Sequence, residues 1–360
     1  MDNLTWKMHV IIPTPGNSTR YSPVTLSSEW PTLSRLLFII ICSCLGTTIN
    51  GFFVAAFFVE HTLKKVGNVF LACIGLADLI VTTGVMPVSA VVLLSAGQWD
   101  TLPVCHVLHF LTEASTYAYS FFFVLVAIET YWRLGCTVFQ YEHVFVSSRV
   151  GIVAFLVFVA CFATAGVGVY LHLDYDYCQR LHNGDYNFRV TTFATFHAVP
   201  SVITLLCLIG CCFKVRSRAR RHVYYKRSQQ YERDFSTTNL NITAFLLYVA
   251  AWTPYIVVSL KYPNTNDSKF YHCVWIGVFR SVFTTFLYSS MNRSFRRAFA
   301  HLFYYCCCKS TVSGSFSSRH RRAFEYKSAT GDVRVHIMHQ AVSTNSPQRG
   351  ASTSRETQEL

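Results

Sequence analysis

Two charged residues, Asp78 and Arg280, stand inside long apolar stretches of the sequence. A charged side chain at the centre of a membrane helix costs about 3 kcal/mol on insertion scales, so each is a functional hypothesis by default. The chemistry that such residues offer is electrostatic. Two structural alternatives stay open: Asp78 could tie helices together through Asn50, and the Arg280 guanidinium could reach toward the lipid headgroups.

Covalent catalysis is not indicated. No nucleophile, base and orienting group stand together in the sequence, so we expect neither an enzyme nor a cofactor. The 14 histidines are scattered, and a single one such as His197 is more often a hydrogen-bonded helix residue than a ligand. Several of the 14 cysteines, such as Cys73 and Cys161, lie within apolar runs, where a thiol behaves as a small buried hydrophobe.

The composition is that of a membrane protein. Of 360 residues, 52% are hydrophobic and 14% are charged, against about 25% charged in a soluble domain. The net charge of +13 is compatible with nucleic acid, anionic lipid or the cytoplasmic loops of a membrane protein as the partner. The positions of the charges decide between these.

Seven apolar stretches are long enough to cross the bilayer, which takes roughly 20 helical residues. They run from Leu33 to Val59, Asn68 to Leu94, Leu102 to Leu134, Arg149 to Leu171, Phe188 to Phe213, Asn239 to Tyr262 and Phe270 to Ser289. We therefore predict an all-α membrane protein, a seven-transmembrane helix bundle. The predicted parts are a tail at 1–32, the bundle at 33–291, an amphipathic helix with a cysteine cluster at 292–309, and a disordered tail at 310–360.

Lysine and arginine gather after the first and fifth stretches and after the seventh, which predicts that these segments face the cytoplasm. The amino terminus is then extracellular, in a multi-pass protein of the plasma membrane. Asn3 and Asn17 open sequons in the outer tail and are predicted to carry glycans. The basic segment after the fifth stretch is read as a surface for inner-leaflet lipid and protein partners, so no nucleic acid is expected.

Three cysteines, Cys306, Cys307 and Cys308, follow the last stretch closely. Without further histidine or cysteine at ligand spacing, they predict palmitoylation rather than metal binding. No signal peptide opens the chain, so the first stretch is expected to target the protein. No internal repeat is visible, and an odd number of crossings weighs against a transporter built from two inverted halves.

Specific motifs resemble the rhodopsin-like class of G-protein-coupled receptors over residues 33–305. They are Asn50 in the first stretch, Leu76-Ala77-Asp78 in the second, Trp252-Thr253-Pro254 in the sixth and Tyr288 after the seventh. The resemblance implies a disulfide between Cys105 and Cys178. It also implies a short amphipathic eighth helix after Asn292 and a sixth helix whose inner half swings outward at its proline.

Within this class the chain is most similar to melatonin-receptor-like receptors and related orphans. The similarity rests on Gly67-Asn68-Val69-Phe70, Gln140 to Phe145, Asp174 to Cys178, and Phe196-His197 before Pro200. Melatonin itself is not expected as the ligand, because recognition in that group uses an asparagine of the fourth helix, and none stands between Arg149 and Leu171.

The chain differs from the class at positions that the class uses to change between its inactive and active states. Glu129-Thr130-Tyr131 stands where an acid, arginine and tyrosine are usual, which puts ordinary coupling in doubt. Arg133 could pair with Glu129 at i+4, reach Asp234, or remain solvated. The usual Asn-Pro before Tyr288 is missing as well, so the seventh helix should be straighter.

Arg280 lies one turn before Thr284, and by resemblance this segment faces the pocket around Asp78 where many members of the class hold a sodium ion. We expect the Arg280 guanidinium to pair with Asp78 and to replace that ion.

By resemblance the ligand pocket lies in the outer half of the bundle. It is lined by Thr112, Glu113, Thr116, Thr192, Phe196, Trp252, Tyr255, Ser259 and Val274. Apolar and hydroxyl groups dominate this set, which suits a small neutral or lipid-like molecule. No aspartate stands at Thr112, which disfavours a biogenic amine unless Glu113 substitutes.

Two functions remain open at this point. The first is an orphan receptor that passes a small-molecule signal to a heterotrimeric G protein, with arrestin as a further partner. Glu129, Thr130, Tyr131, Arg133, Asp234, Pro254 and Tyr288 would form its switch and G-protein face. The second is a weakly signalling or silent scaffold, decoy or partner of another receptor, which the absent arginine would explain.

Overall fold

The computed structural model describes residues 21–26, 30–59, 63, 66–96, 98–180, 186–261 and 267–307. The chain divides into two compact units, Met1–Leu302 and Phe303–Leu360. The first unit contains the helix bundle and the buried charged sites discussed below. Of the second unit, the described residues are the last turn of a helix that ends at Cys307.

Seven helical segments are long and apolar enough to cross a membrane, which confirms the predicted fold class. In chain order they are α2 (Thr32–Val59), α3 with η2 and α4 (Val66–Ile80, Val81–Val85 and Met86–Leu94), α5 (Leu102–Gly135), α7 (Ser147–Tyr170), α8 with η3 and α9 (Tyr186–Phe193, Ala194–Ala198 and Val199–Arg221), α11 (Gln229–Lys261) and α12 (Asp267–Met291). Shorter helices are α1 (Pro23–Leu26), α6 (Val138–Val144), α10 (Val223–Lys226) and α13 (Arg293–Cys307).

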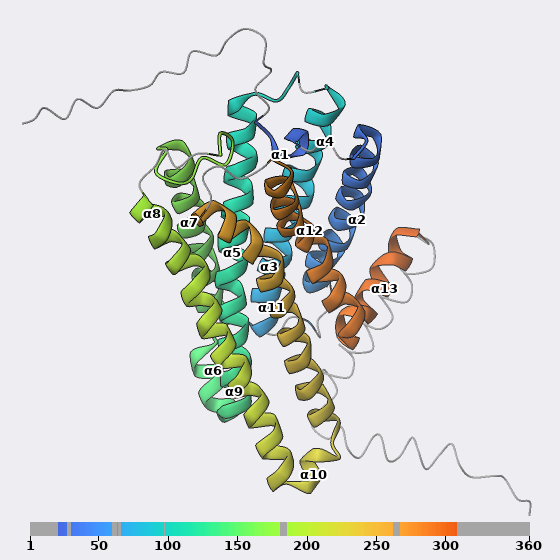
Figure 1. The fold of residues 1–360 in the computed structure, drawn as a ribbon. Helices are drawn as coiled ribbons and strands as arrows, with labels where there is room; N and C mark the ends of the chain where they lie inside the picture. Colours follow the sequence, from blue (N-terminus) through green and yellow to red (C-terminus); the bar gives the residue numbers. More distant parts are fainter. Residues whose placement is uncertain are drawn as a thin grey trace, which may run out of the picture. The chain divides into compact units, whose positions relative to one another are not determined.

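Helix α5 lies at the centre of the bundle and packs against α3, α7, α9 and α11 (Figure 1). Within its most apolar window 78% of the residues are buried, compared with 22% for α2 and for α7. The central helix therefore supplies many of the buried side chains, whereas α2 and α7 turn most of their apolar surface outward, as helices that face lipid do. We call the end that carries Cys105 the outer end and the opposite end the inner end, following the predicted orientation.

Each of the two interrupted crossings contains a π-helical turn that ends two positions before a proline. The turn η2 precedes Pro87, and η3 precedes Pro200. Proline has no N–H to donate and its ring clashes with the preceding turn, so the wider π turn accommodates it. Helix α12, which lacks a proline, is α-helical without interruption from Asp267 to Met291.

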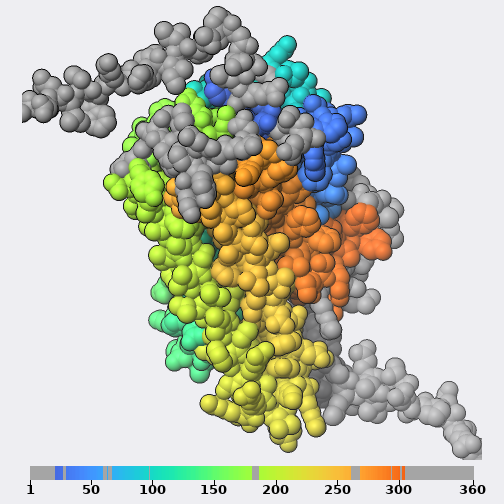
Figure 2. All heavy atoms as spheres, viewed as in Figure 1, coloured from blue at the N-terminus to red at the C-terminus, as the bar shows by residue number. Residues whose placement is uncertain are grey.

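Two predicted helix ends are wrong. The fifth crossing continues past Phe213 to Arg221, and the sixth begins at Gln229 rather than at Asn239. Hydropathy ends a predicted span where the charges begin, but the backbone hydrogen bonds of a helix continue into water regardless of side-chain polarity. In Figure 2 the resulting extensions of α9 and α11, together with α10, project at the inner end.

The eighth helix, α13, is amphipathic. Phe295 and Ala298 are each 2% exposed, whereas Arg296 and Arg297 are exposed. The Phe295 ring stacks on Phe53 of α2 with centroids 4.4 Å apart. One face of the helix therefore packs on the bundle, as a helix lying along a membrane surface would.

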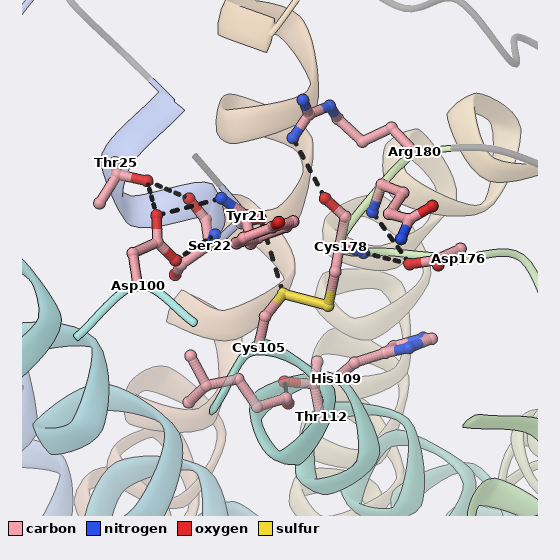
Figure 3. The surroundings of a disulfide bond; sticks show 12 residues. Tyr21, Ser22, Thr25, Asp100, Cys105, His109, Thr112, Asp176, Cys178 and Arg180 are labelled. Carbon is pink, nitrogen blue, oxygen red and sulfur yellow. Dashed lines mark hydrogen bonds between the residues drawn. A yellow bond between two sulfur atoms is a disulfide. The ribbon is translucent and has the colours of Figure 1, made fainter. Parts of the chain in front are cut away.

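A disulfide joins Cys105 to Cys178, which confirms the predicted bridge (Figure 3). Beside it, Asp100 anchors the amino-terminal segment. Its carboxylate accepts hydrogen bonds from the backbone N–H of Tyr21 at 3.1 Å and of Ser22 at 2.8 Å, and from the Thr25 hydroxyl at 2.7 Å. Helix α1 is thereby held across the outer end, with all four of its residues buried.

Candidate functional site

A cluster of buried charges occupies the outer half of the bundle. Arg189, in α8, is 3% exposed. Its Nη1 lies 3.1 Å from the Asp174 carboxylate and 3.5 Å from Glu113 Oε1, and its Nη2 donates to Ser259 Oγ at 2.8 Å. One guanidinium thus connects the outer loop, α5 and α11.

Glu113 is the centre of this cluster. The Tyr255 hydroxyl donates to Glu113 Oε1 at 2.9 Å, and His109 Nε2 lies 3.6 Å from the same oxygen. We call Glu113, Asp174, Arg189, Tyr255 and Ser259 the outer charge cluster. Two carboxylates face one guanidinium in it, so the formal charges of the three groups sum to one negative charge.

The predicted pocket residues fall into three groups in the structure. Glu113, Tyr255 and Ser259 belong to the outer charge cluster. The hydroxyls of Thr112, Thr116 and Thr192 donate to backbone carbonyls of their own helices. Phe196 packs on Tyr117 at a centroid distance of 4.4 Å, Trp252 meets Tyr255 edge to face at 5.5 Å, and Val274 is buried in the apolar core.

Three members of this site were missed in the sequence. Arg189 is the second residue of the predicted fifth span, where an arginine can reach the interface and is not unusual, so its burial could not be read from the sequence. Asp174 lies in a loop and His109 on a buried helix face, and neither position carries a local signal. Their inclusion makes this part of the bundle charged rather than apolar and hydroxylic.

Tyr177 of the outer loop closes the site from outside. Its ring stacks on His109 at a centroid distance of 4.8 Å and meets Tyr255 edge to face at 6.3 Å. Burial, followed by the negative charge of Glu113, raises the pKa of Tyr177 well above its usual range. The Tyr177 ring packs on His109 and Tyr255, the two residues that contact Glu113.

The second buried site lies deeper, where Arg280 Nη2 approaches Asp78 Oδ1 at 3.0 Å. Both side chains are fully enclosed, with side-chain exposures of 1% and 0%. The guanidinium carbon also lies 3.8 Å from the centroid of the Tyr119 ring, a cation–π contact. Asp78 and Arg280 are 202 positions apart in the sequence and are the pair expected from the motifs.

Asn50 does not tie Asp78 to another helix by a hydrogen bond in the described structure. Instead its Nδ2 donates to the Ser281 carbonyl at 3.0 Å, and the Thr285 hydroxyl donates to its Oδ1. The Thr284 hydroxyl lies 3.4 Å from the Tyr119 hydroxyl. These contacts fix α12 against α2 and α5 in the turns that follow Arg280.

At the inner end Arg133 bridges two helices. Its Nε lies 3.4 Å from Glu129 Oε1 and its Nη1 lies 3.5 Å from Asp234 Oδ1 of α11. The Tyr141 hydroxyl donates to Glu129 at 2.7 Å and the Tyr225 hydroxyl donates to Asp234 at 2.9 Å. Both arrangements suggested by the sequence, the i+4 pair and the reach to α11, are present at once.

The two tyrosines are held as neutral donors. Burial, together with the Glu129 charge, raises the pKa of Tyr141. Burial and the hydrogen bond to Asp234 raise the pKa of Tyr225 to about 12. The second crossing approaches closely here, because a Cβ at Gly67 would overlap the Glu129 carboxylate.

The remaining predicted switch residues are dispersed. Thr130 accepts a hydrogen bond from Asn241 Nδ2 at 3.4 Å, and Tyr288 donates to Asn241 Oδ1 at 2.8 Å, so Asn241 of α11 links α5 to α12. Tyr131 faces α9, where Lys214 Nζ lies 3.3 Å from its ring centroid. Pro254 lies within α11, farther toward its outer end.

Asn3, Asn17 and Cys308 lie outside the described residues. Cys306 and Cys307 form the end of α13. Glycosylation and palmitoylation of these positions remain predictions.

Comparisons with known proteins identify relatives of this architecture. A family model described as 7 transmembrane receptor (rhodopsin family) matches residues 49–292. The chain is 22% identical to mouse melatonin receptor type 1A over 313 residues, 82% of this chain and 86% of that receptor. It is 19% identical to the fruit-fly RYamide receptor over 280 residues, 69% of this chain and 60% of that protein.

A shorter match gives higher identity. The chain is 28% identical to fruit-fly 5-hydroxytryptamine receptor 2A over 186 residues, which is 49% of this chain and 21% of that receptor's length.

Proposed function

Because the chain belongs to the rhodopsin family of seven-transmembrane receptors, we propose that it is a signalling receptor of the plasma membrane with its amino terminus outside. In this proposal a small extracellular molecule rearranges the outer charge cluster and shifts α11. The shift exposes the inner face to a heterotrimeric G protein, and arrestin binds the same face.

One observation supports this mechanism most directly: α11 is held near both ends by arginines of other helices. Arg189 donates to Ser259 near the outer end, and Arg133 pairs with Asp234 near the inner end. Pro254, between them, interrupts the backbone hydrogen bonds and lets the two parts of the helix move separately. A ligand that binds better when the Arg189 contacts are rearranged would shift the population toward the displaced helix.

We propose that the ligand is small and polar. The cavity that opens beside the cluster has a volume of about 190 Å³ and is lined by His109 and Asp174 among others. The expectation of a neutral or lipid-like ligand rested on a pocket without Arg189 and Asp174. Similar receptors are named for melatonin, 5-hydroxytryptamine and RYamide, three chemically different molecules, so the relatives do not select a ligand.

The competing function, a silent scaffold or decoy, rests on Thr130 in place of arginine. It is not favoured, because the inner end has another arginine that joins α5 to α11. Basal G-protein activation and arrestin recruitment, measured in cells for the wild type and for Thr130→Arg, separate the two functions. The receptor predicts a wild-type signal above that of cells lacking the protein. A signal from Thr130→Arg alone would favour the scaffold.

Arg133→Gln is expected to raise basal G-protein activation about two- to fivefold. The Arg133 side chain is one-third exposed, and an ion pair of this kind stabilises a structure by roughly 0.5–1 kcal/mol. An energy of about 1.4 kcal/mol changes an equilibrium constant tenfold, so losing the pair shifts the balance of the two states by about two- to fivefold. Arg227→Gln removes an exposed arginine from the same inner end and serves as the control. Equal basal activity in Arg133→Gln and the wild type, at equal surface expression, would contradict a restraining role for Arg133.

Sodium is expected to leave the wild-type protein unchanged. The Arg280 guanidinium lies 3.0 Å from Asp78 and already supplies the positive charge that a bound sodium ion would bring. Thermal unfolding of the purified protein in sodium chloride and in potassium chloride of the same ionic strength tests this. A melting temperature that rises with sodium but not with potassium would show that the guanidinium does not replace the ion.

A further inference from the structure

A second group of ionisable side chains lies at the outer end, outside the outer charge cluster. His106 is in the first turns of α5, His172 follows the end of α7, and Asp176 lies in the outer loop. All three line the cavity of about 190 Å³. The imidazole centroids of His106 and His172 are 5.5 Å apart. A ring nitrogen of His106 lies within 4.8 Å of an Asp176 carboxylate oxygen.

The disulfide brings two of these residues together. His106 directly follows Cys105, and Asp176 precedes Cys178 by two positions. The Asp176 carboxylate is also fixed by the backbone, because its Oδ1 accepts from the N–H groups of Cys178 and Gln179, both at 2.9 Å (Figure 3). The sulfur of Cys178 is nearby, but it is bonded to Cys105 and is not a thiolate ligand.

His172 occupies an unusual backbone conformation. Its φ is 53°, in the left-handed region, and the following N–H, of Leu173, donates to the Gly168 carbonyl at 3.1 Å. This is the helix-ending turn in which glycine or asparagine is favoured, because a Cβ is strained there. Histidine at this position directs an imidazole to the cavity, and the strain is an observation from which a function can be inferred.

We propose that His106, His172 and Asp176 bind a zinc ion, or a similar divalent transition metal, at the outer end. Two imidazoles and one carboxylate are ligands that zinc accepts, whereas calcium and magnesium take oxygen ligands. Tetrahedral zinc with bonds of about 2.1 Å places ligand atoms roughly 3.4 Å apart. The side chain of His172 is exposed and can rotate to close this distance. The fourth position is open to water.

The metal would act on the site below it. His109 and Asp174 line the same cavity, and they contact Glu113 and Arg189 respectively. A bound dication ties α5 to the end of α7 and to the outer loop, and it adds positive charge beside a cluster that sums to one negative charge. Metal binding itself is independent of whether the protein signals through a G protein.

Thermal unfolding of the purified full-length protein tests the proposal. Zinc chloride at micromolar concentrations is expected to raise the melting temperature saturably above its value in EDTA, while magnesium at the same concentrations has no effect. His172→Asn and Asp176→Asn are expected to weaken the apparent zinc affinity by about tenfold or more. Asparagine is tolerated in the left-handed turn at 172, and at 176 it keeps the Oδ1 acceptor, so both variants retain the local backbone. His222→Asn changes an exposed inner-end histidine and is the control.

Loss of the zinc response in both outer variants, with its retention in His222→Asn, supports the site. An absent response in the wild type, or an equal response in all four proteins, overturns it. If an outer variant melts lower than the wild type in EDTA, cobalt absorption of the folded fraction replaces the melting measurement. Ligand-field bands in the wild type that vanish in the variant support the site, and equal bands contradict it.

Discussion

Arg280→Met should leave little stably folded protein, because the Asp78 carboxylate in the centre of the membrane loses its cationic partner. Asp78 is fully buried, and the one described cation beside it is Arg280, at 3.0 Å. Removing one partner of a buried ion pair costs roughly 3–5 kcal/mol, a large part of the stability of most proteins. We expect a sharply lower melting temperature of the purified protein and a matching loss of surface expression.

The double variant Asp78→Asn with Arg280→Met should recover much of this loss, because neither remaining side chain is charged. Arg296→Met removes an exposed arginine of α13 and should leave the melting temperature near that of the wild type. Wild-type stability of Arg280→Met alone would show that the folded protein does not need the guanidinium beside Asp78. A double variant no better than Arg280→Met would show that the side chains stabilise the helices by packing rather than as a pair.

Arg189→Met is expected to be comparably harmful at the outer end. It leaves Glu113 and Asp174, which are 2% and 5% exposed, without their shared guanidinium. Tyr255 still donates to Glu113, so we expect a loss of about 3 kcal/mol, at the lower end for a broken buried pair. The contact with Ser259 of α11 is lost as well, so basal G-protein activation of the remaining folded protein should change.

Arg189→Lys is the matched variant for this test. Lysine keeps the charge, but its single ammonium cannot span Glu113, Asp174 and Ser259 as the planar guanidinium does, so an intermediate melting temperature is expected. The triple variant Glu113→Gln, Asp174→Asn, Arg189→Met removes all three charges and should be more stable than Arg189→Met. If Arg189→Met has the same melting temperature as the wild type, the outer half of the bundle is not stabilised by these charges.

The motifs predicted the family correctly, because most of them consist of residues adjacent or nearly adjacent in the chain. Trp252 and Pro254 could be assigned without knowing how the helices pack, and the pairing of the two distant cysteines followed from the resemblance. The predicted boundaries at Phe213 and Asn239 were wrong for the opposite reason: hydropathy reports where lipid contact ends, and the helical backbone of α9 and α11 continues beyond that point.

The contacts of Arg133 and Arg189 show which features local sequence patterns cannot predict. The spacing of Arg133 and Glu129 predicted one contact, but the simultaneous contact with Asp234 depends on how α11 is rotated about its own axis. Arg189 was visible as a charge in a span, yet its partners lie 15, 70 and 76 positions away in the sequence. No periodicity encodes those pairings.

By itself, then, the sequence determined the number of crossings, the all-helical class, the disulfide and the family, because each depends on the length, polarity or identity of residues in one or two short segments. Only the tertiary structure decided which charges meet. Ion pairs form within 4 Å or so, and a helix rotated by one residue, roughly 100°, would aim the same side chain at a different neighbour or at lipid. The contacts of Arg189 with Glu113 and Asp174, and the position of two histidines beside Asp176, are consequences of packing. The Arg280–Asp78 pair was expected from the resemblance, and the structure supplied its geometry.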